Sequence, residues 1–393
     1  MDTTDLVELT RTLVRARSVH EPQTGGSEAV SAAIVADWMR RAGWSVTTDD
    51  VAPGRPNVIA TIDGGGGPGR TLMFVGHTDV VTEGDRRAWS VDPYEAVLRD
   101  GRIHGRGAAD MKGGLAAMMV AAADLVADGP FPGRLVLAAL VDEEGLMLGS
   151  KRLAAGPWVR GVDGVIVCEP EGGEICTCAK GAIRIRVELT GAMAHGAMPD
   201  LARNPLPVAA RIVAALGQVE RDLVAASGRH ELLGRASVTP TVLQAGDPDQ
   251  INVVPGSATV AFDVRTIPGV DHAALVDTLT AAVLDAAAGT DVDARVTVLD
   301  DRPVVDTPRD HPLVTTLAAA HEAVTGEPAR YGGVPGATDG TILSRDAGLA
   351  TVVYGPGGKW IAHQADEYVE VADLVTAAAV YRHAAARFFR GES

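Results

Sequence analysis

Histidine and carboxylate side chains stand just beyond several short apolar runs of the sequence. These side chains are His77, Asp79, Asp110, Glu143, Glu144 and Glu169. Ligands of an open α/β sheet bind in the crevice outside the carboxyl ends of the strands, so we expect these groups to converge there. So many unpaired carboxylates share a crevice only when cations neutralise them. The pattern therefore predicts a metal site, whereas a single acidic residue in a loop is usually just solvated.

The types of these side chains indicate which metal is expected. Imidazole and carboxylate ligands without a set of thiolates are typical of zinc or a similar first-row divalent ion, whereas calcium prefers oxygen ligands only. A dinuclear site is the most economical interpretation of so many ligands. Asp79 follows His77 by two residues and lies on the same face of an extended segment. Its carboxylate is placed to accept the N–H of the second ring nitrogen of His77, and the alternative is an aspartate in a turn.

Glu143 and Glu144 are adjacent and can divide two tasks. One faces the metal and its neighbour faces a water molecule, because a base must lie within hydrogen-bond reach of the water to deliver hydroxide. This division indicates a hydrolase. For an isolated acidic triplet at 142–144, the alternative is a helix N-terminus at which the carboxylates complement the helix dipole.

Apolar runs and their periodicity indicate the elements that hold these groups. Strands buried on both faces of an α/β sheet are expected at 58–62, 71–75, 135–140 and 164–168, with helical stretches between some of them. From residue 183 the order of elements changes to strand, helix, strand, strand, helix, strand, which describes a ferredoxin-like module. Alternation returns from residue 312. We therefore expect a discontinuous catalytic domain, residues 1–181 and 301–393, and an inserted domain, residues 182–300.

The composition narrows the class of protein. The 393 residues carry 51 acidic and 35 basic side chains, a net charge of −16, which argues against a nucleic-acid-binding protein. The N-terminus lacks the features of a secretory signal, and no window is apolar enough for a membrane span. We expect a cytoplasmic protein with no membrane partner. The cysteines are too few for a disulfide framework and are expected to be small buried side chains; they are Cys168, Cys176 and Cys178.

Longer motifs resemble a known family. The motifs are Gly76-His77-Thr78-Asp79-Val80-Val81, Trp89, Asp92-Pro93 and Ala362-His363-Gln364-Ala365-Asp366-Glu367-Tyr368-Val369, and they keep their order along almost the full chain. They resemble the dinuclear-zinc metallopeptidases and amidohydrolases that include acetylornithine deacetylase, succinyl-diaminopimelate desuccinylase, aminoacylase and carboxypeptidase G. The resemblance implies an α/β, zinc-peptidase-like three-layer catalytic domain with an inserted ferredoxin-like α+β lid or dimerisation domain.

The resemblance also implies roles for single residues of the catalytic domain. His77 and Glu169 match the ligands of one zinc ion. Glu144 and His363 match those of the other, and Asp110 matches the carboxylate that bridges both. In the same way, Glu143 matches the general base and Asp79 the partner of His77. The cofactors implied are two zinc ions, with cobalt or manganese as substitutes.

In the inserted domain, residues 191–195 followed by Pro199 match the motif that bears a histidine. This residue, His195, is expected to polarise the scissile carbonyl, often from the other subunit, so the resemblance implies a homodimer. Asn252 and Arg265 match positions associated with substrate binding, and the fork of Arg265 suits a carboxylate. An ordinary surface or interface arginine is the alternative. The segment from Gly336 to Asp339, which includes Thr338, resembles the loop that lines the substrate site.

These features predict a metal-dependent amide hydrolase that removes an acyl group from an N-acyl amino acid or a related small amide, as a deacetylase or desuccinylase does. A dipeptidase, a glutamate-type carboxypeptidase and an N-carbamoyl-amino-acid hydrolase are the alternatives within the family. A catalytically silent binding protein of the same fold is another alternative. Such a protein is expected to lose the base or the bridging ligand, and both Asp110 and Glu143 are present. A nucleotide-binding oxidoreductase lacks support, because the glycine-rich dinucleotide fingerprint is missing.

Overall fold

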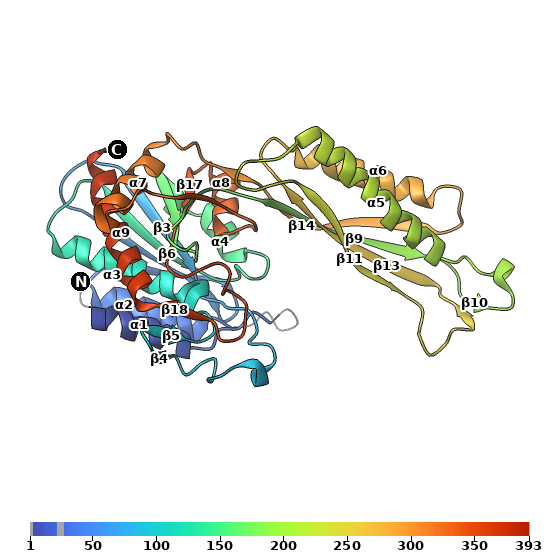
Figure 1. Cartoon of the computed structure of the whole chain (residues 1–393), viewed down its shortest axis with the longest axis horizontal. Coiled ribbons are helices and arrows are strands. Elements are labelled where there is room, and N and C mark those ends of the chain that lie inside the picture. The colour runs from blue at the N-terminus through green and yellow to red at the C-terminus, as the bar shows by residue number, and fades with distance from the viewer. Residues whose placement is uncertain (1–2, 22–26, 393) are drawn as a thin grey trace. The chain divides into compact units, whose positions relative to one another are not determined.

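The structure, a computed structural model, describes residues 3–21 and 27–392 of the chain (Figure 1). By its internal contacts the chain forms two compact units. The first unit comprises Met1–Cys178, Val305–Val334 and Thr338–Ser393, and the second comprises Ala179–Val304 and Pro335–Ala337. In the sequence, the second unit therefore interrupts the first.

A nine-stranded mixed sheet forms the centre of the first unit. Its order is β1-β2-β6-β3-β7-β17-β8-β15, and β16 pairs with β8. The bounds are β1 (Ser45–Ala52), β2 (Arg55–Asp63), β3 (Thr71–His77), β6 (Arg134–Leu140), β7 (Gly164–Val167), β8 (Ile175–Ala179), β15 (Val305–Asp306), β16 (Tyr331–Val334) and β17 (Thr351–Val353). Strands β6, β3, β7 and β17 are parallel to one another. Their carboxyl ends therefore meet at one edge of the sheet.

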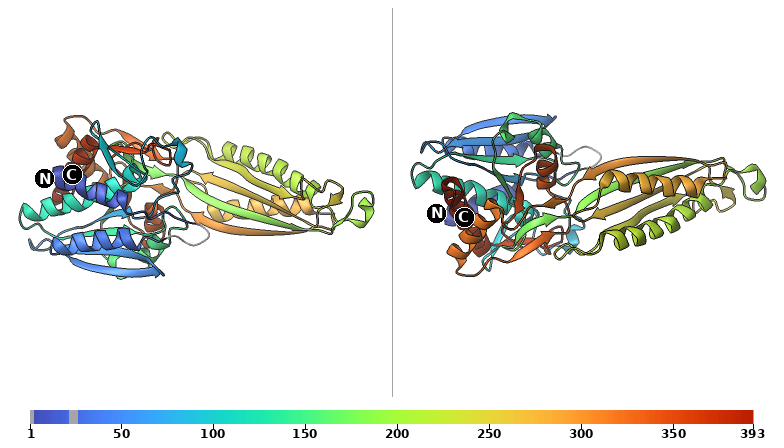
Figure 2. Two further views of the ribbon diagram at one scale, coloured as in Figure 1. Left: turned by 90° about the horizontal axis from the view of Figure 1, so that it is seen from below. Right: turned by 90° about the horizontal axis from the view of Figure 1, so that it is seen from above.

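Helices cover both faces of this sheet, which gives three layers (Figures 1 and 2). One core cluster joins alternate strand residues, such as Leu72 and Phe74, to the helices of the first face. These helices are α1 (Thr3–Arg15), α2 (Ala29–Arg41), α3 (Gly113–Ala127), α7 (Pro312–Thr325) and α9 (Val371–Arg390). On the other face, α4 (Leu148–Ala154) packs on α8 (Asp339–Ala347), and α8 contacts β3, β7 and β17.

The strands expected from apolar runs are confirmed as β2, β3, β6 and β7. They are visible in the sequence because a central strand is buried on both faces, and every residue of β3 is buried. The apolar runs do not predict β1 or α8. β1 lies at the edge of the sheet and has no fully buried residue, so it carries no apolar run. α8 is short, and Thr338 caps it by accepting a hydrogen bond from the N–H of Gly340 at 3.2 Å.

A separate three-stranded sheet connects two segments that are far apart in the sequence. Its order is β18-β5-β4, with β4 (Val97–Arg99), β5 (Arg102–His104) and β18 (Tyr368–Glu370). Tyr368 pairs with His104 across the β18–β5 ladder. β5 is followed by one helical turn, η2 (Ala108–Lys112), which leads into α3. The glycine-rich segment that contains Asp110 is therefore held next to the segment that follows His363.

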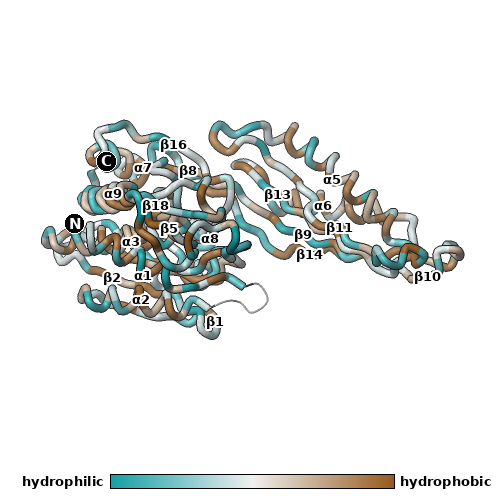
Figure 3. Tube along the Cα trace, turned by 60° about the horizontal axis from the view of Figure 1, so that its bottom comes forward, coloured by the Kyte–Doolittle hydropathy of each residue, from teal (hydrophilic) through white to brown (hydrophobic). Residues whose placement is uncertain are grey.

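The second unit is a four-stranded antiparallel sheet with two helices. The sheet order is β11-β13-β9-β14. The elements are β9 (Gly181–Thr190), α5 (Leu206–Ser227), β11 (Ser237–Ala245), β13 (Ser257–Thr266), α6 (His272–Ala287) and β14 (Asp293–Arg302). This is the expected ferredoxin-like order. Along α5 and α6, hydrophobic and hydrophilic residues alternate, as in amphipathic helices (Figure 3).

One face of this second sheet packs against the helices and the other does not. In β9, Ile183 and Ile185 are buried in the core with α5 and α6, whereas Arg186 and Glu188 are exposed. A two-stranded ribbon of β10 (Ala194–His195) and β12 (Val253–Val254) completes the unit. None of the helices in the described ranges is long and apolar enough to cross a lipid bilayer.

Candidate active site

Three parallel strands deliver the predicted residues to one edge of the first sheet. β3 ends at His77, β6 leads into the segment 142–144, and β7 leads into Glu169. The side chains of His77, Glu143 and Glu169 are buried, and those of Asp110 and Glu144 are largely buried. The expected convergence at the carboxyl ends of the strands is what the structure shows.

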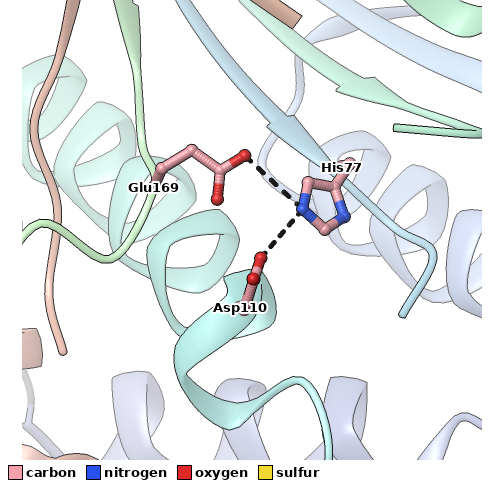
Figure 4. A group of neighbouring side chains, drawn as sticks. All are labelled: His77, Asp110 and Glu169. Carbon is pink, nitrogen blue, oxygen red and sulfur yellow. Dashed lines mark hydrogen bonds and ion pairs between the residues drawn. The ribbon is translucent and has the colours of Figure 1, made fainter. Parts of the chain in front are cut away.

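One ring nitrogen of His77 faces two carboxylates (Figure 4). Its Nε2 atom is 3.1 Å from Oδ1 of Asp110 and 3.5 Å from Oε1 of Glu169. Ligand atoms of these three residues lie within 4.8 Å of one another. One imidazole and two carboxylates at this separation suit a single divalent ion of the first transition row.

A second group shares Asp110 with the first. Nε2 of His363 is 3.0 Å from Oε1 of Glu144 and 3.2 Å from Oδ2 of Asp110. The two carboxylate oxygens of Asp110 therefore face two different histidines, Oδ1 toward His77 and Oδ2 toward His363. A carboxylate in this orientation is able to bridge two ions.

Glu143 joins the cluster from the side of Glu144. The ligand atoms of His77, Glu143 and Glu144 also lie within 4.8 Å of one another. Burial raises the pKa of Glu143 well above the ordinary range of a carboxyl, and the negative charges of Glu144 and Asp110 add to the rise. The Glu143 side chain is thus suited to take up a proton and hold it.

The pKa values of Glu169, His77 and His363 are raised as well. Burial raises the pKa of Glu169 well above its ordinary value, with a contribution from Asp110. Burial alone lowers the pKa of His77, but the carboxylates of Glu169 and Asp110 outweigh it and leave the pKa well above its ordinary value. Hydrogen bonds to Asp110 and Glu144 raise the pKa of His363 to about 10. The site is therefore one of surplus negative charge, and it favours any cation.

Asp79 supports the cluster in a different way from the one expected. Nδ1 of His77 is 2.9 Å from the backbone carbonyl oxygen of Asp79 and 3.6 Å from its carboxylate. The carboxylate accepts hydrogen bonds from the backbone N–H groups of Glu143, at 3.3 Å, and Glu144, at 3.1 Å. Asp79 thus orients the imidazole with its backbone and both glutamates with its side chain.

Sequence reasoning missed the charges that hold the segment after β6. Asp142 points away from the cluster, where Oδ2 accepts the N–H groups of Leu146 and Leu148. Its Oδ1 is 2.7 Å from Nη2 of Arg55, and the guanidinium of Arg55 also binds Glu28. All three charged side chains are at most 6% exposed. No local pattern signals Arg55 or Glu28, because each is recognisable only through its distant partners.

The other predicted residues lie partly in the second unit. His195 is exposed on β10 and accepts the N–H of Ala197 at Nδ1, and Asn252 is exposed next to β12. Because His195 pairs with Val253, His195 and Asn252 are neighbours. Arg265 lies near the end of β13 and binds Asp263, with Nε 2.6 Å from Oδ1.

Within the second unit, Arg265 and His195 lie at opposite ends of the sheet. Arg265 pairs with Ala182 at the start of β9, close to where the chain enters this unit at Ala179. The ribbon that bears His195 follows the other end of β9, at Thr190. At the usual rise of a strand, Ala182 and Thr190 are about 26 Å apart. Of the predicted loop residues, Gly336 belongs to the second unit and Thr338 to the first.

A further group of possible metal ligands is already paired with a lysine side chain. Glu171, Glu174 and Cys176 offer ligand atoms within 4.8 Å of one another. Nζ of Lys359 lies 2.8 Å from Glu171 and 3.4 Å from Glu174, and burial raises the pKa of the Cys176 thiol. Lys359 therefore already pairs with both carboxylates, and burial disfavours the thiolate form of Cys176 that a metal would need. All three cysteines are buried, as expected, and no disulfide joins residues in the described ranges.

Comparison with known proteins agrees with this geometry. The profile of Peptidase family M20/M25/M40 matches residues 73–387. The succinyl-diaminopimelate desuccinylase of Methylobacterium nodulans is 32% identical over 98% of this chain and 96% of its own length.

Two solved structures share the fold. An M20 family metallo-carboxypeptidase from Sulfolobus solfataricus has a TM-score of 0.80 at 20% identity and covers 98% of each chain. A Bacillus subtilis protein described as a dinuclear metal binding peptidase has a TM-score of 0.74 at 17% identity, covering 99% of this chain and 98% of its own. From the length of the profile match and the identity to the desuccinylase, this chain belongs to Peptidase family M20/M25/M40 and is a hydrolase of amide C–N bonds.

Proposed function

We propose that this protein removes an acyl group from an N-acyl amino acid and uses two zinc ions to do so. His77 and Glu169 would hold one ion, Glu144 and His363 would hold the other, and Asp110 would contribute one carboxylate oxygen to each. The observation that carries the proposal is the orientation of Asp110, whose two carboxylate oxygens face the two imidazoles.

The donor set fits this pair of ions. Two imidazoles and several carboxylates meet, and the described part of the cluster contains no thiolate. Zinc accepts such ligands, and cobalt or manganese can take its place. When bound, the ions supply Lewis acidity toward the amide carbonyl and lower the pKa of water.

The chain itself supplies the proton transfers and the orientation. Glu143 takes a proton from the attacking water at its carboxylate and delivers the proton to the nitrogen of the leaving amine. Asp79 fixes the backbone of both glutamates, so that one turns to the metal ligands and its neighbour to the water. His195 donates a hydrogen bond to the carbonyl oxygen as negative charge develops there.

Carboxylate recognition assigns the substrate class. Nε and Nη2 of Arg265 donate to the Asp263 carboxylate, and the N–H groups at the outer end of the guanidinium, on Nη1 and Nη2, suit the carboxylate of an amino acid or of a succinyl group. Asn252, Gly336 and Thr338 line the rest of the substrate site. The relative named succinyl-diaminopimelate desuccinylase, aligned over nearly the whole chain, supports a desuccinylase-type substrate.

We further propose a homodimer in which His195 serves the site of the other subunit. The ends of the second sheet support this arrangement, because His195 lies about a strand length from the place where its own chain enters the unit. The edge strand β11 exposes Val242 and Leu243. An exposed apolar edge is a template for pairing with a second copy.

A substrate panel tests the proposed activity. The protein is assayed with zinc, cobalt or manganese on succinyl-, acetyl-, carbamoyl- and aminoacyl-amino acids, and release of the free amine is measured. We expect the succinyl or acetyl compounds to be cleaved fastest. Cleavage of the aminoacyl compounds alone would make the protein a dipeptidase and contradict the proposal.

The Glu143→Gln variant tests the base in the same assay. We expect kcat to fall by about 10²- to 10⁴-fold, the usual contribution of a positioned general base. The matched control is Glu8→Gln, which changes an exposed carboxylate that binds only Arg11 and should leave kcat unchanged. Bound metal without turnover of any compound would indicate a binding protein instead.

A further inference from the structure

Two buried side chains outside the ligand set, Arg106 and Glu367, join the segments that carry Asp110 and His363. Arg106 is 2% exposed and Glu367 is fully buried. Arg106 follows β5 and Glu367 precedes β18, and these two strands pair with each other (Figure 1). The two residues form an ion pair between Nη1 of Arg106 and Oε2 of Glu367.

The second oxygen of Glu367 holds the backbone at Asp110. Oε1 accepts hydrogen bonds from the N–H groups of Ala109, at 3.0 Å, and Asp110, at 3.1 Å. The carboxylate therefore fixes the backbone from which the bridging side chain of Asp110 projects. A carboxylate that accepts two N–H donors and one guanidinium has little freedom to rotate.

The guanidinium of Arg106 holds the backbone at His363. Nη2 donates a hydrogen bond to the carbonyl oxygen of His363 at 3.3 Å, and the guanidinium lies over the ring of Trp89 at 5.2 Å. His363 has a φ of 64°, a conformation that side chains other than glycine rarely adopt. Such a conformation persists where its surroundings hold it, and Arg106 supplies a contact of this kind.

We propose that Arg106 and Glu367 are positioning residues that fix Asp110 and His363 relative to each other and thereby set the affinity of the metal site formed by Asp110, Glu144 and His363. The proposal rests on the proposed two-metal function. It goes further by assigning metal affinity to two side chains that contact no ligand atom of the cluster. Groups that orient metal ligands typically change metal affinity 10- to 100-fold when they are altered.

If Arg106 and Glu367 only stabilised the fold, a different result would be expected. Their substitution would change the stability of the metal-free protein and leave metal affinity alone. The chain offers a matched control in Arg102 and Glu370, which join the same two strands with Nη2 2.8 Å from Oε1. Both are about 40% exposed and lie on the solvent side.

The test is calorimetric titration of the metal-free protein with zinc, repeated with cobalt to follow its visible absorption. For Glu367→Gln we expect one of the two ions to bind 10- to 100-fold more weakly and the absorption of that ion to change. Glu370→Gln should bind both ions as the wild type does. Wild-type affinities for both ions in Glu367→Gln, whatever its stability, would overturn the proposal.

A second variant covers the case in which Glu367→Gln fails to fold because Arg106 is left buried and unpaired. The double variant Arg106→Met/Glu367→Gln removes both charges and leaves no charge of this pair unpaired. We expect it to fold and to show the same weakened ion, and wild-type affinity in the double variant would overturn the proposal. Failure of the wild-type protein to bind two ions would instead overturn the proposed function, so the two failures are distinguishable.

Discussion

At the scale of single residues, the negative charges of the cluster favour the binding of cations and lower the stability of the metal-free protein. Burial and nearby carboxylates raise the pKa values of Glu143, Glu144 and Glu169 in the metal-free protein. An acid whose pKa is raised on folding destabilises the fold as the pH rises above its unfolded value. The same charges stabilise bound cations, so these residues face opposite demands.

This conflict predicts that Glu143→Gln stabilises the metal-free protein while it lowers kcat by about 10²- to 10⁴-fold. Glutamine has nearly the same shape but adds no charge to the cluster. We expect the free energy of unfolding at pH 7 to rise by about 1–2 kcal/mol, the range of single stabilising changes. Denaturant unfolding in the presence of a chelator measures it. Equal or lower stability of the variant would show that the Glu143 carboxyl group does not destabilise the metal-free protein.

Asp79 allows the two roles found for it to be separated. Its carboxylate binds the N–H groups of Glu143 and Glu144, whereas its backbone oxygen orients His77. Asp79→Asn keeps the backbone but replaces one acceptor oxygen with a donor. We expect kcat to fall about 10- to 100-fold with KM little changed, since the glutamates move and the substrate contacts do not. Steady-state kinetics measures both constants, and a change confined to KM would contradict this assignment.

The residues that sequence analysis found and missed differ in how they are encoded. Each predicted ligand before residue 170 stands in a short motif, and three of the four motifs follow an apolar run. Arg106 and Glu367 are 261 positions apart, and Arg55 and Glu28 are 27 apart. In a sequence, a charged residue that is buried in the fold cannot be told from an exposed polar residue until its partner is known. The residues that converge in the cluster were therefore predictable, and the charges that position them were not.

At the scale of elements, the segment after β6 depends on three charges from separate places. Arg55 at the start of β2 lies between Glu28 and Asp142, and Asp142 has a φ of 68°. The loop that presents Glu143 and Glu144 is therefore anchored behind the site by one guanidinium. β2, β3, β6 and β7 were predictable because each contains a short apolar run, but such an anchor has no periodic signal.

Removal of this anchor should be costly. Arg55→Met keeps most of the volume but leaves the carboxylates of Glu28 and Asp142 buried without a cation. We expect a loss of about 3–5 kcal/mol in the free energy of unfolding, as for other buried pairs that lose one partner. The control is Arg152→Met, which breaks a more exposed pair with Asp49 and should cost less than about 1 kcal/mol. Similar costs for the two variants, measured by urea unfolding, would contradict the anchoring role.

At the scale of the whole molecule, the residues predicted for the active site come from both units of the chain. The first unit carries every residue of the cluster. The second unit carries Arg265 on β13 and His195 on the separate β10–β12 ribbon, which follows the other end of β9. The ferredoxin-like order of the second unit was predictable from alternating runs. Periodicity does not show which strand would pair with the exposed edge of β11. The large apolar side chains that this strand exposes are Val242 and Leu243.

Mixing two inactive variants decides whether His195 acts across a dimer. Glu143→Gln lacks the base and His195→Ala lacks the carbonyl donor. In a mixed dimer, the site with an intact Glu143 receives His195 from the other subunit, so one of its two sites is complete. Random exchange makes half of the dimers mixed, and about one quarter of wild-type activity should return.

The complementation separates the two arrangements because they predict different totals. If His195 serves its own subunit, every site in the mixture lacks either the base or the donor, and no activity returns at any ratio. The exchange is monitored on the same samples by giving the two variants different affinity tags and capturing the mixed dimers through one of them. A third variant, Leu243→Asp, places a charge on the exposed edge of β11 and should convert the dimer to monomers that retain both metal ions and lose turnover. A monomeric Leu243→Asp protein with full activity would contradict the role of the second copy even if the edge strand forms the interface.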